Sequence, residues 1–210
     1  MTRCSPFQQF TAQYEAWFSE HSMVYEAELK AVKSLLPEGR RGMEVGVGTG
    51  RFAVPFGIEV GIEPSTNMGA VARGRGIKVL GGVAEDLPLK TSCFDVILMV
   101  TTLCFLDDVN RSLRECRRVL RQGGYLIIGF VDRTSLIGRD YVRHRHENVF
   151  YREATFYSVG EVIEAMSSTG FHEFTFSQTI FEELSRVTAH EEVRPGYGKG
   201  SFVVIRGKKV

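Results

Sequence analysis

The run at residues 42–53 reads Gly42-Met43-Glu44-Val45-Gly46-Val47-Gly48-Thr49-Gly50-Arg51-Phe52-Ala53, and the fold prediction starts from it. An apolar strand, predicted at 43–47, leads into glycines at three alternate positions. Glycine adopts the positive φ angles of a sharp turn and lets a ligand lie directly against the main chain. A helix expected at about 50–55 would point unpaired N–H groups at an anionic part of that ligand. The pattern predicts a ligand site at a strand–turn–helix junction of an α/β fold.

A second predicted strand, at 58–63, ends in the carboxylate of Glu63. In a doubly wound sheet a carboxylate at this place holds the hydroxyls of a ribose, so the glycine turn and Glu63 together predict a nucleoside-containing cofactor. The nicotinamide dinucleotide fingerprint requires glycine or alanine three positions after its second glycine. That position is Arg51, which argues against a dinucleotide.

Length and composition indicate one domain with an ordinary core, since the chain has 210 residues and 43% hydrophobic residues. The net charge is +1, from 26 basic and 25 acidic residues, so we expect no nucleic-acid or membrane partner. The four cysteines show no C-x-x-C spacing, which argues against a metal site or a disulfide framework. The N-terminus has no signal pattern and no apolar run is long enough for a bilayer, so we expect a cytoplasmic protein.

Strand and helix patterns alternate through the middle of the chain. Apolar spacing of three and four predicts a helical region at 7–36. Further strands are predicted at 77–82, 94–101, 124–131, 171–181 and 201–206, and further helices at 65–74, 108–121 and 158–168. Asp107 is the expected N-cap of the helix at 108–121, and the stretch 183–199 is expected to be a loop. Such alternation predicts a parallel sheet covered by helices on both faces, with a ligand at the carboxyl ends of its strands.

Three further motifs follow the glycine turn and Glu63 in a fixed order. They read Ala84-Glu85-Asp86-Leu87-Pro88, Phe94-Asp95-Val96 and Arg118-Val119-Leu120-Arg121-Gln122-Gly123-Gly124. With these five elements the chain resembles the class I S-adenosylmethionine-dependent methyltransferases. The likeness is strongest to the small-molecule branch that includes the ubiquinone and menaquinone biosynthesis methyltransferases. The resemblance implies a Rossmann-like, doubly wound and mostly parallel sheet of seven strands, the last antiparallel, with an N-terminal helical cap.

The resemblance also implies S-adenosylmethionine as cofactor, with S-adenosylhomocysteine as product. Gly46, Gly48 and Gly50 would pass beneath the methionine part of the cofactor, and Glu44 would face its amino group. Val100, at the end of a strand, would lie under the sulfonium. An apolar surface suits this place because the sulfonium is a cation.

On the nucleoside side, the resemblance implies that Glu63 holds the ribose diol and that Val83 and Ala84 meet the adenine, with Glu85 alongside. Val83 departs from the family, which often has Asp or Asn here to bind the adenine amino group. Tyr14 matches the tyrosine of an N-terminal helix that folds over the cofactor.

The organisation expected from these features is a single domain. It comprises a helical cap at 1–40, a cofactor-binding core at 41–132, an acceptor-site insertion at 133–157 and a C-terminal helix with a strand pair at 158–210. Residues 139–157 combine four arginines, two histidines and five aromatic residues. Either they form a solvated helix packed on the core, or they cover the methyl acceptor.

The candidates for acceptor binding are aromatic or basic residues, namely Phe105, Tyr141, Arg143, Arg145 and Tyr151. His144 or His146 is the candidate general base, because imidazole exchanges protons near neutral pH. These choices imply an anionic or aromatic acceptor.

The predicted function is transfer of a methyl group from S-adenosylmethionine to a small molecule by in-line displacement. Two alternatives stay open, an NAD(P)-dependent oxidoreductase and a non-catalytic S-adenosylmethionine-binding module. The sequence leaves open which atom is methylated, and a monomer and a homodimer are both expected possibilities.

Overall fold

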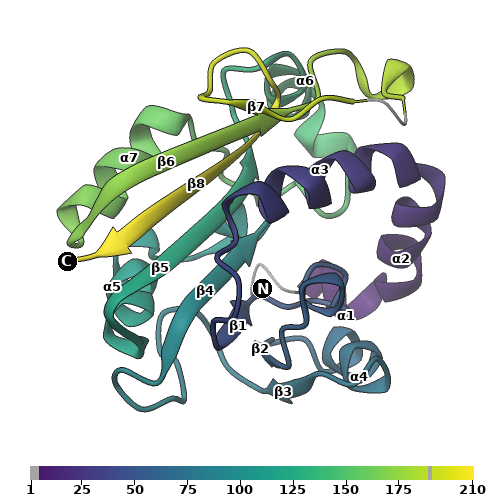
Figure 1. Ribbon diagram of the computed structural model, residues 1–210. Coiled ribbons are helices and arrows are strands. Elements are labelled where there is room, and N and C mark those ends of the chain that lie inside the picture. Colours follow the sequence, from purple (N-terminus) through teal and green to yellow (C-terminus); the bar gives the residue numbers. More distant parts are fainter. Residues whose placement is uncertain (1–4, 189–190) are drawn as a thin grey trace.

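The computed structural model describes residues 5–188 and 191–210, so Cys4 and His190 lie outside the described residues (Figure 1). Within these ranges eight strands form one sheet, in the order β3-β2-β1-β4-β5-β8-β6-β7. The strands are β1 (Gly42–Val45), β2 (Val60–Ile62), β3 (Lys78–Leu80), β4 (Phe94–Val100), β5 (Leu120–Val131), β6 (Phe171–Thr179), β7 (Arg194–Pro195) and β8 (Phe202–Lys209).

The strands β1 to β5 are parallel, whereas β8 runs antiparallel to both of its neighbours, β5 and β6. This confirms the predicted doubly wound sheet with its last strand antiparallel. The structure adds an eighth strand, the short β7, which pairs with the far edge of β6 in a stretch predicted to be a loop. Local sequence did not predict β7 because only its pairing with β6 makes it a strand.

Helices cover both faces of the sheet. They are α1 (Ser5–Gln9), α2 (Thr11–Glu20), α3 (Ser22–Leu35), α4 (Thr66–Gly74), α5 (Val109–Val119), α6 (Leu136–His144) and α7 (Val159–Ser168). Figure 1 shows α5 and α7 on one side of the sheet and α3 on the other. Strand β4 supplies both layers, since Ile97 and Met99 pack in the cluster with α5 and α7, whereas Val96, Leu98 and Val100 pack in the cluster with α3.

The N-terminal region predicted as helical, 7–36, consists of three helices rather than one. The chain leaves helical geometry at Phe10 and at His21, where ψ is 34° and 42°. These breaks let α1 and α2 turn toward the carboxyl ends of the parallel strands, while α3 lies along the sheet (Figure 1). Helix α1 contacts α4, and both elements flank the site described below.

The prediction of a helix at 50–55 is wrong. The chain forms turns there and one turn of 3-10 helix, η1 (Val54–Phe56). Gly57 ends that turn at φ 65°, and Ile58 already leads into β2. Too few residues separate the glycine turn from the second strand to complete an α-helix.

The helix predicted at 108–121 starts and ends differently. Its N-cap is Asp108, whose side chain accepts a hydrogen bond from the Arg111 N–H, and not Asp107. Its last residue is Val119, because Leu120 pairs with Phe94 of β4 and so belongs to β5. The helix predicted at 158–168 is confirmed. Ser158 is its N-cap and forms a complete capping box with Glu161.

No helix in the described part of the chain is long and apolar enough to cross a membrane. Among the same residues, no group of three or more His, Cys, Asp or Glu side chains could hold a metal ion.

Candidate active site

A cavity of about 570 Å³ lies at the carboxyl ends of the parallel strands. Its floor comes from the segments that follow β1, β2, β3 and β4, and from the end of β5. The other walls come from α1, α2, α3, α6 and the residues between α6 and α7, together with Leu184. A volume of this size falls in the range of small-molecule sites, about 300–1,000 Å³.

The glycine turn forms one edge of the cavity. Gly46, Gly48 and Gly50 have φ angles of 68°, 54° and 87°, which L side chains rarely adopt. Gly46 has a second constraint, since a Cβ there would lie 2.4 Å from the Thr102 side chain. The Gly46 and Val47 N–H groups donate to the Ile62 carbonyl at 2.9 and 3.0 Å, which fixes the turn against β2.

The carboxylate of Glu63 lies beside the glycine turn and is 8% exposed. One oxygen, Oε2, accepts the Gly48 N–H at 2.9 Å, and the other, Oε1, accepts the Ser65 N–H at 2.8 Å. Burial raises the pKa of Glu63, while these two N–H donors act to lower it. Each carboxylate oxygen can accept more than one hydrogen bond, so Glu63 can also receive hydroxyl donors from a ligand.

Two residues predicted for the cofactor site, Glu44 and Gly50, do not line the cavity. Glu44 is fully buried below the turn, and its Oε2 has no hydrogen-bond partner among the described residues. Burial raises the pKa of Glu44 well above its usual value. Gly50 faces Ile77, Val54 and α4, so its role is close packing beneath the turn.

The edge predicted to bind adenine is formed by 82–85. Val83, Ala84 and Glu85 line the cavity, and Val83 is 46% exposed there. Glu85 uses its carboxylate elsewhere as well, because Oε1 accepts the N–H groups of Asp107 and Asp108 at 2.9 and 3.2 Å. It therefore holds the start of α5 against residues 82–85, a role that its position in the motif did not predict.

Tyr14 and Val100 both line the cavity. The Tyr14 hydroxyl lies 3.5 Å from the position that a Cβ on Gly48 would occupy, so α2 covers the glycine turn directly. Burial raises the pKa of Tyr14, and the carboxylates of Glu44 and Glu63 raise it further. Tyr14 is therefore a neutral hydroxyl at any ordinary pH.

A charge cluster fastens α2 to the glycine turn. The Glu15 carboxylate forms ion pairs with Arg51 and Arg75 and accepts a hydrogen bond from the Thr49 hydroxyl. Partial burial disfavours the charge, but the hydrogen bonds from Arg75, Arg51 and Thr49 outweigh it and lower the pKa of Glu15 to about 2. Arg51, which argued against a dinucleotide, thus connects the turn to the helical cap.

Helix α1 is fastened to the first turn of α4. The Gln8 Oε1 accepts hydrogen bonds from Ser65 Oγ at 2.8 Å and from the Asn67 N–H at 3.1 Å. Ser65 also binds Glu63, so α1 is one residue away from the carboxylate edge of the cavity.

The remaining wall is aromatic. Ring centroids lie 4.8 Å apart for Phe7 and Phe105, and 6.4 Å apart for Phe105 and Tyr151. The centroids of Tyr151 and Tyr141 lie 4.9 Å apart. Phe150 contacts Phe7 at 5.1 Å. All five line the cavity, and we call them the aromatic wall. Of the residues predicted to bind the acceptor, Phe105, Tyr141 and Tyr151 are thus brought together.

Known proteins share this architecture and much of the sequence. Residues 43–128 match the family model described as methyltransferase domain. One solved structure is that of an S-adenosylmethionine-dependent methyltransferase from Thermotoga maritima, described as a possible histamine N-methyltransferase. Its sequence is 51% identical to this chain. The match covers 99% of this chain and 100% of the Thermotoga chain, with a TM-score of 0.97. This chain belongs to the S-adenosylmethionine-dependent methyltransferases.

Two other relatives of this methyltransferase share less of its sequence. An uncharacterized protein of Methanocaldococcus jannaschii is 42% identical over 97% of this chain and 98% of its own length. A malonyl-[acyl-carrier protein] O-methyltransferase of Geobacter sulfurreducens is 28% identical over 96% of this chain and 82% of its own length. The resemblance inferred from the five motifs is confirmed, and S-adenosylmethionine is the cofactor.

The residues of the methyltransferase fit this cofactor. The turn around Gly48 leaves backbone beside the cavity where a side chain would intrude, and the Glu63 carboxylate has acceptor capacity for the hydroxyls of a ribose. Val100 and the aromatic wall provide the apolar and aromatic surroundings that a sulfonium cation favours.

Four predicted acceptor-site residues lie outside the cavity: Arg143, His144, Arg145 and His146. His144 is paired with Asp140 of its own helix, Nδ1 to Oδ1 at 3.0 Å, and the His146 ring faces Arg145. Tyr141 is half-buried on α6, whereas Arg143 and His144 are exposed, and α6 ends at His144, so Arg145 and His146 do not continue its inward face. The structure therefore does not support the predicted roles of the two histidines and two arginines.

One cavity residue, Glu28, is not among the candidates predicted from the sequence. It lies on α3, is 5% exposed and faces the cavity. A sequence signal existed, because Glu28 stands between Val24 and Val32 on the apolar stripe of α3, where a carboxylate is unexpected.

Proposed function

We propose that this methyltransferase transfers the methyl group of S-adenosylmethionine to a small-molecule acceptor that occupies the aromatic end of the cavity. The observation that carries the proposal is the continuity of one cavity. Its lining includes the glycine turn and Glu63 at one side and the aromatic wall at the other. The small volume and the cover formed by α1 and α2 favour an acceptor of limited size over a macromolecule.

The chemistry of the proposed reaction makes few demands on the protein. S-adenosylmethionine supplies a methyl group on a sulfonium, whose departure as a neutral thioether needs no acid. Glu63 and the glycine turn hold one reactant, and the aromatic wall orients the other and excludes water. In-line positioning at about 3 Å is the main contribution expected from such a site.

The Thermotoga relative favours the same class of reaction. Its description names histamine, a small aromatic amine, as a possible acceptor of that protein. An acceptor of similar size would match the aromatic wall of this chain.

A transfer assay tests the proposal. The protein is incubated with S-adenosylmethionine labelled in its methyl group and a panel of small amines, alcohols, thiols and carboxylates. We expect label in a small organic product and formation of S-adenosylhomocysteine. Label found only in added protein or nucleic acid would contradict a small-molecule acceptor.

A further inference from the structure

The cavity contains a buried carboxyl group that no other residue satisfies. Glu28 lies on α3, is 5% exposed and lines the cavity. Among the described residues its carboxyl group forms no ion pair and no hydrogen bond, and burial alone raises its pKa to about 8. Because an unpartnered buried charge costs several kcal/mol, burial favours the neutral acid, and the charged form of Glu28 would need a partner supplied by a ligand.

The surroundings of Glu28 are aromatic and come from several elements. Tyr14 from α2, Tyr25 from α3, Tyr141 from α6 and Tyr151 from the segment before α7 are all close enough for the Glu28 charge to raise their pKa values. The rings of Tyr141 and Tyr151 are in contact, with their centroids 4.9 Å apart. Tyr14, Tyr141 and Tyr151 also line the cavity, where their hydroxyls can contact a ligand held at Glu28 and their ring faces attract a cation.

The charge of the lining points the same way. None of the described residues that line the cavity is Lys or Arg, whereas Glu20, Glu28, Glu63, Glu85 and Asp107 are all acidic. A lining of this kind attracts cations and repels anions.

We propose that Glu28 binds a cationic nitrogen of the methyl acceptor and so selects amines as the substrates of this methyltransferase. The proposal rests on the proposed function, which it deepens by naming the acceptor class and the residue that recognises it. It replaces the sequence-based expectation of an anionic acceptor held by Arg143 or Arg145, both of which lie outside the cavity.

The ionisation of Glu28 should respond to the acceptor. In the absence of ligand the group is largely protonated at pH 7, because its pKa is about 8. A bound ammonium favours the carboxylate and lowers that pKa, so amine binding near pH 7 should release a proton and should tighten as pH rises toward 8.

The first experiment compares three probes of the same shape in the presence of saturating S-adenosylhomocysteine. They are 2-phenylethylamine, 2-phenylethanol and 3-phenylpropionate, which differ in charge. Titration calorimetry or ligand-observed NMR should show the amine binding at least tenfold more tightly than the alcohol and the carboxylate. Equal or weaker binding of the amine, or no binding of any probe, would overturn the proposal.

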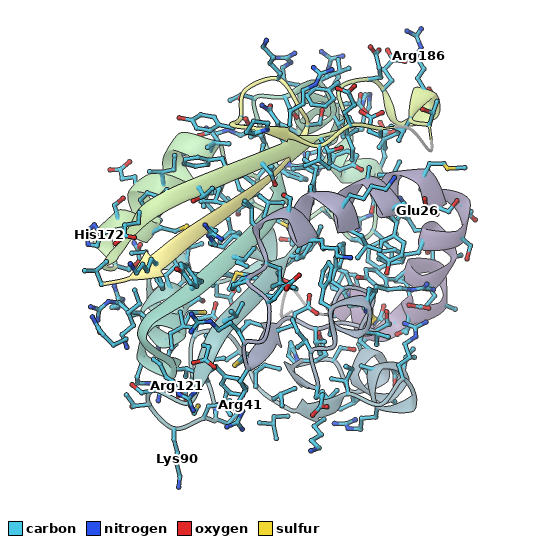
Figure 2. The ribbon with its side chains drawn as sticks, in the orientation of Figure 1. Glu26, Arg41, Lys90, Arg121, His172 and Arg186 are labelled. Carbon is cyan, nitrogen blue, oxygen red and sulfur yellow. The ribbon has the colours of Figure 1, made fainter. Side chains whose placement is uncertain are left out.

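The second experiment replaces the carboxyl group. Glu28→Gln should weaken amine binding 10- to 100-fold, the loss expected for one charge-assisted hydrogen bond, while changing alcohol binding less than twofold. Glu26→Gln is the matched control, since Glu26 is exposed on the same helix, away from the cavity lining (Figure 2). An unchanged amine affinity in Glu28→Gln would contradict the proposal that Glu28 binds the amine.

A third measurement needs no variant. Calorimetry of amine binding in two buffers of different ionisation enthalpy at pH 7 should report release of a fraction of a proton by the unaltered protein. No release would contradict the role of Glu28. Failure of S-adenosylhomocysteine to bind would instead contradict the proposed function, so the two failures can be told apart.

Discussion

At the scale of single residues, Glu63 connects the glycine turn to the start of α4 through its two carboxylate oxygens. Glu63→Ala removes the acceptor of the Gly48 and Ser65 N–H groups as well as the predicted ribose contact. We expect S-adenosylhomocysteine affinity to fall about 10- to 100-fold, because one or two charge-assisted hydrogen bonds are lost. Calorimetry measures the effect, with exposed Glu59→Ala as the control. Unchanged affinity in a folded variant would remove Glu63 from the site.

His144 and His146 lie between Tyr141 and Tyr151 in the sequence, yet only the two tyrosines line the cavity. Both histidines lie outside the cavity, and His144 is already paired with Asp140. We expect His144→Ala and His146→Ala each to leave kcat/KM within twofold, whereas Tyr151→Ala should lower it more than tenfold by opening the aromatic wall. The steady-state kinetics of the three variants provide the comparison. A large loss in only one histidine variant would show that this histidine reaches the acceptor.

At the scale of elements, α2 is held on the glycine turn by the charges around Glu15. Its pKa of about 2 is below the ordinary value of 4.5, so its contribution to stability is present above pH 4.5 and is lost as pH falls toward 2. Glu15→Gln should lower stability at pH 7 by about 1 kcal/mol, or roughly 2–4 °C in Tm. Thermal unfolding from pH 3 to pH 7 should also show a flatter acid limb. An identical pH profile would mean that the cluster contributes nothing to stability.

The same helix carries a spectroscopic probe. Trp17 is the only tryptophan, lines the cavity and stacks on His21 with ring centroids 4.9 Å apart. We expect its emission to change when S-adenosylhomocysteine is added, because the ligand alters the solvent contact of α2. Gly48→Val, whose side chain would crowd Tyr14 and Met68, serves as the non-binding control. An unchanged spectrum at saturation would argue against α2 as a responsive cover.

At the scale of the whole molecule, cofactor binding should be visible as stability. A ligand at about 100 times its Kd adds about 2.7 kcal/mol, which corresponds to roughly 5–10 °C in Tm for a chain of this size. We expect this shift with S-adenosylhomocysteine and none with NADH. A shift with NADH of the same size would contradict the cofactor assignment.

Local patterns sufficed for the centre of the molecule. The glycine turn, Glu63 and the alternation of strands and helices could be predicted because each depends on neighbours in the sequence: φ angles that only glycine adopts easily, a carboxylate at a strand end, and apolar periods. The order of motifs then indicated the family and the cofactor. Even here a short connection misled the prediction, since η1 replaced the expected helix at 50–55.

Only the tertiary structure showed which residues meet at the acceptor end of the cavity. That outcome depends on two breaks in the N-terminal helices and on the rotation of α6, both settled by packing against segments far away in sequence. Tyr141 lines the cavity, whereas His144, three residues later at the end of α6, is exposed. Glu28 shows the same limit, because its place on an apolar stripe was visible in the sequence, but the cavity it faces exists only after α3 packs on the sheet.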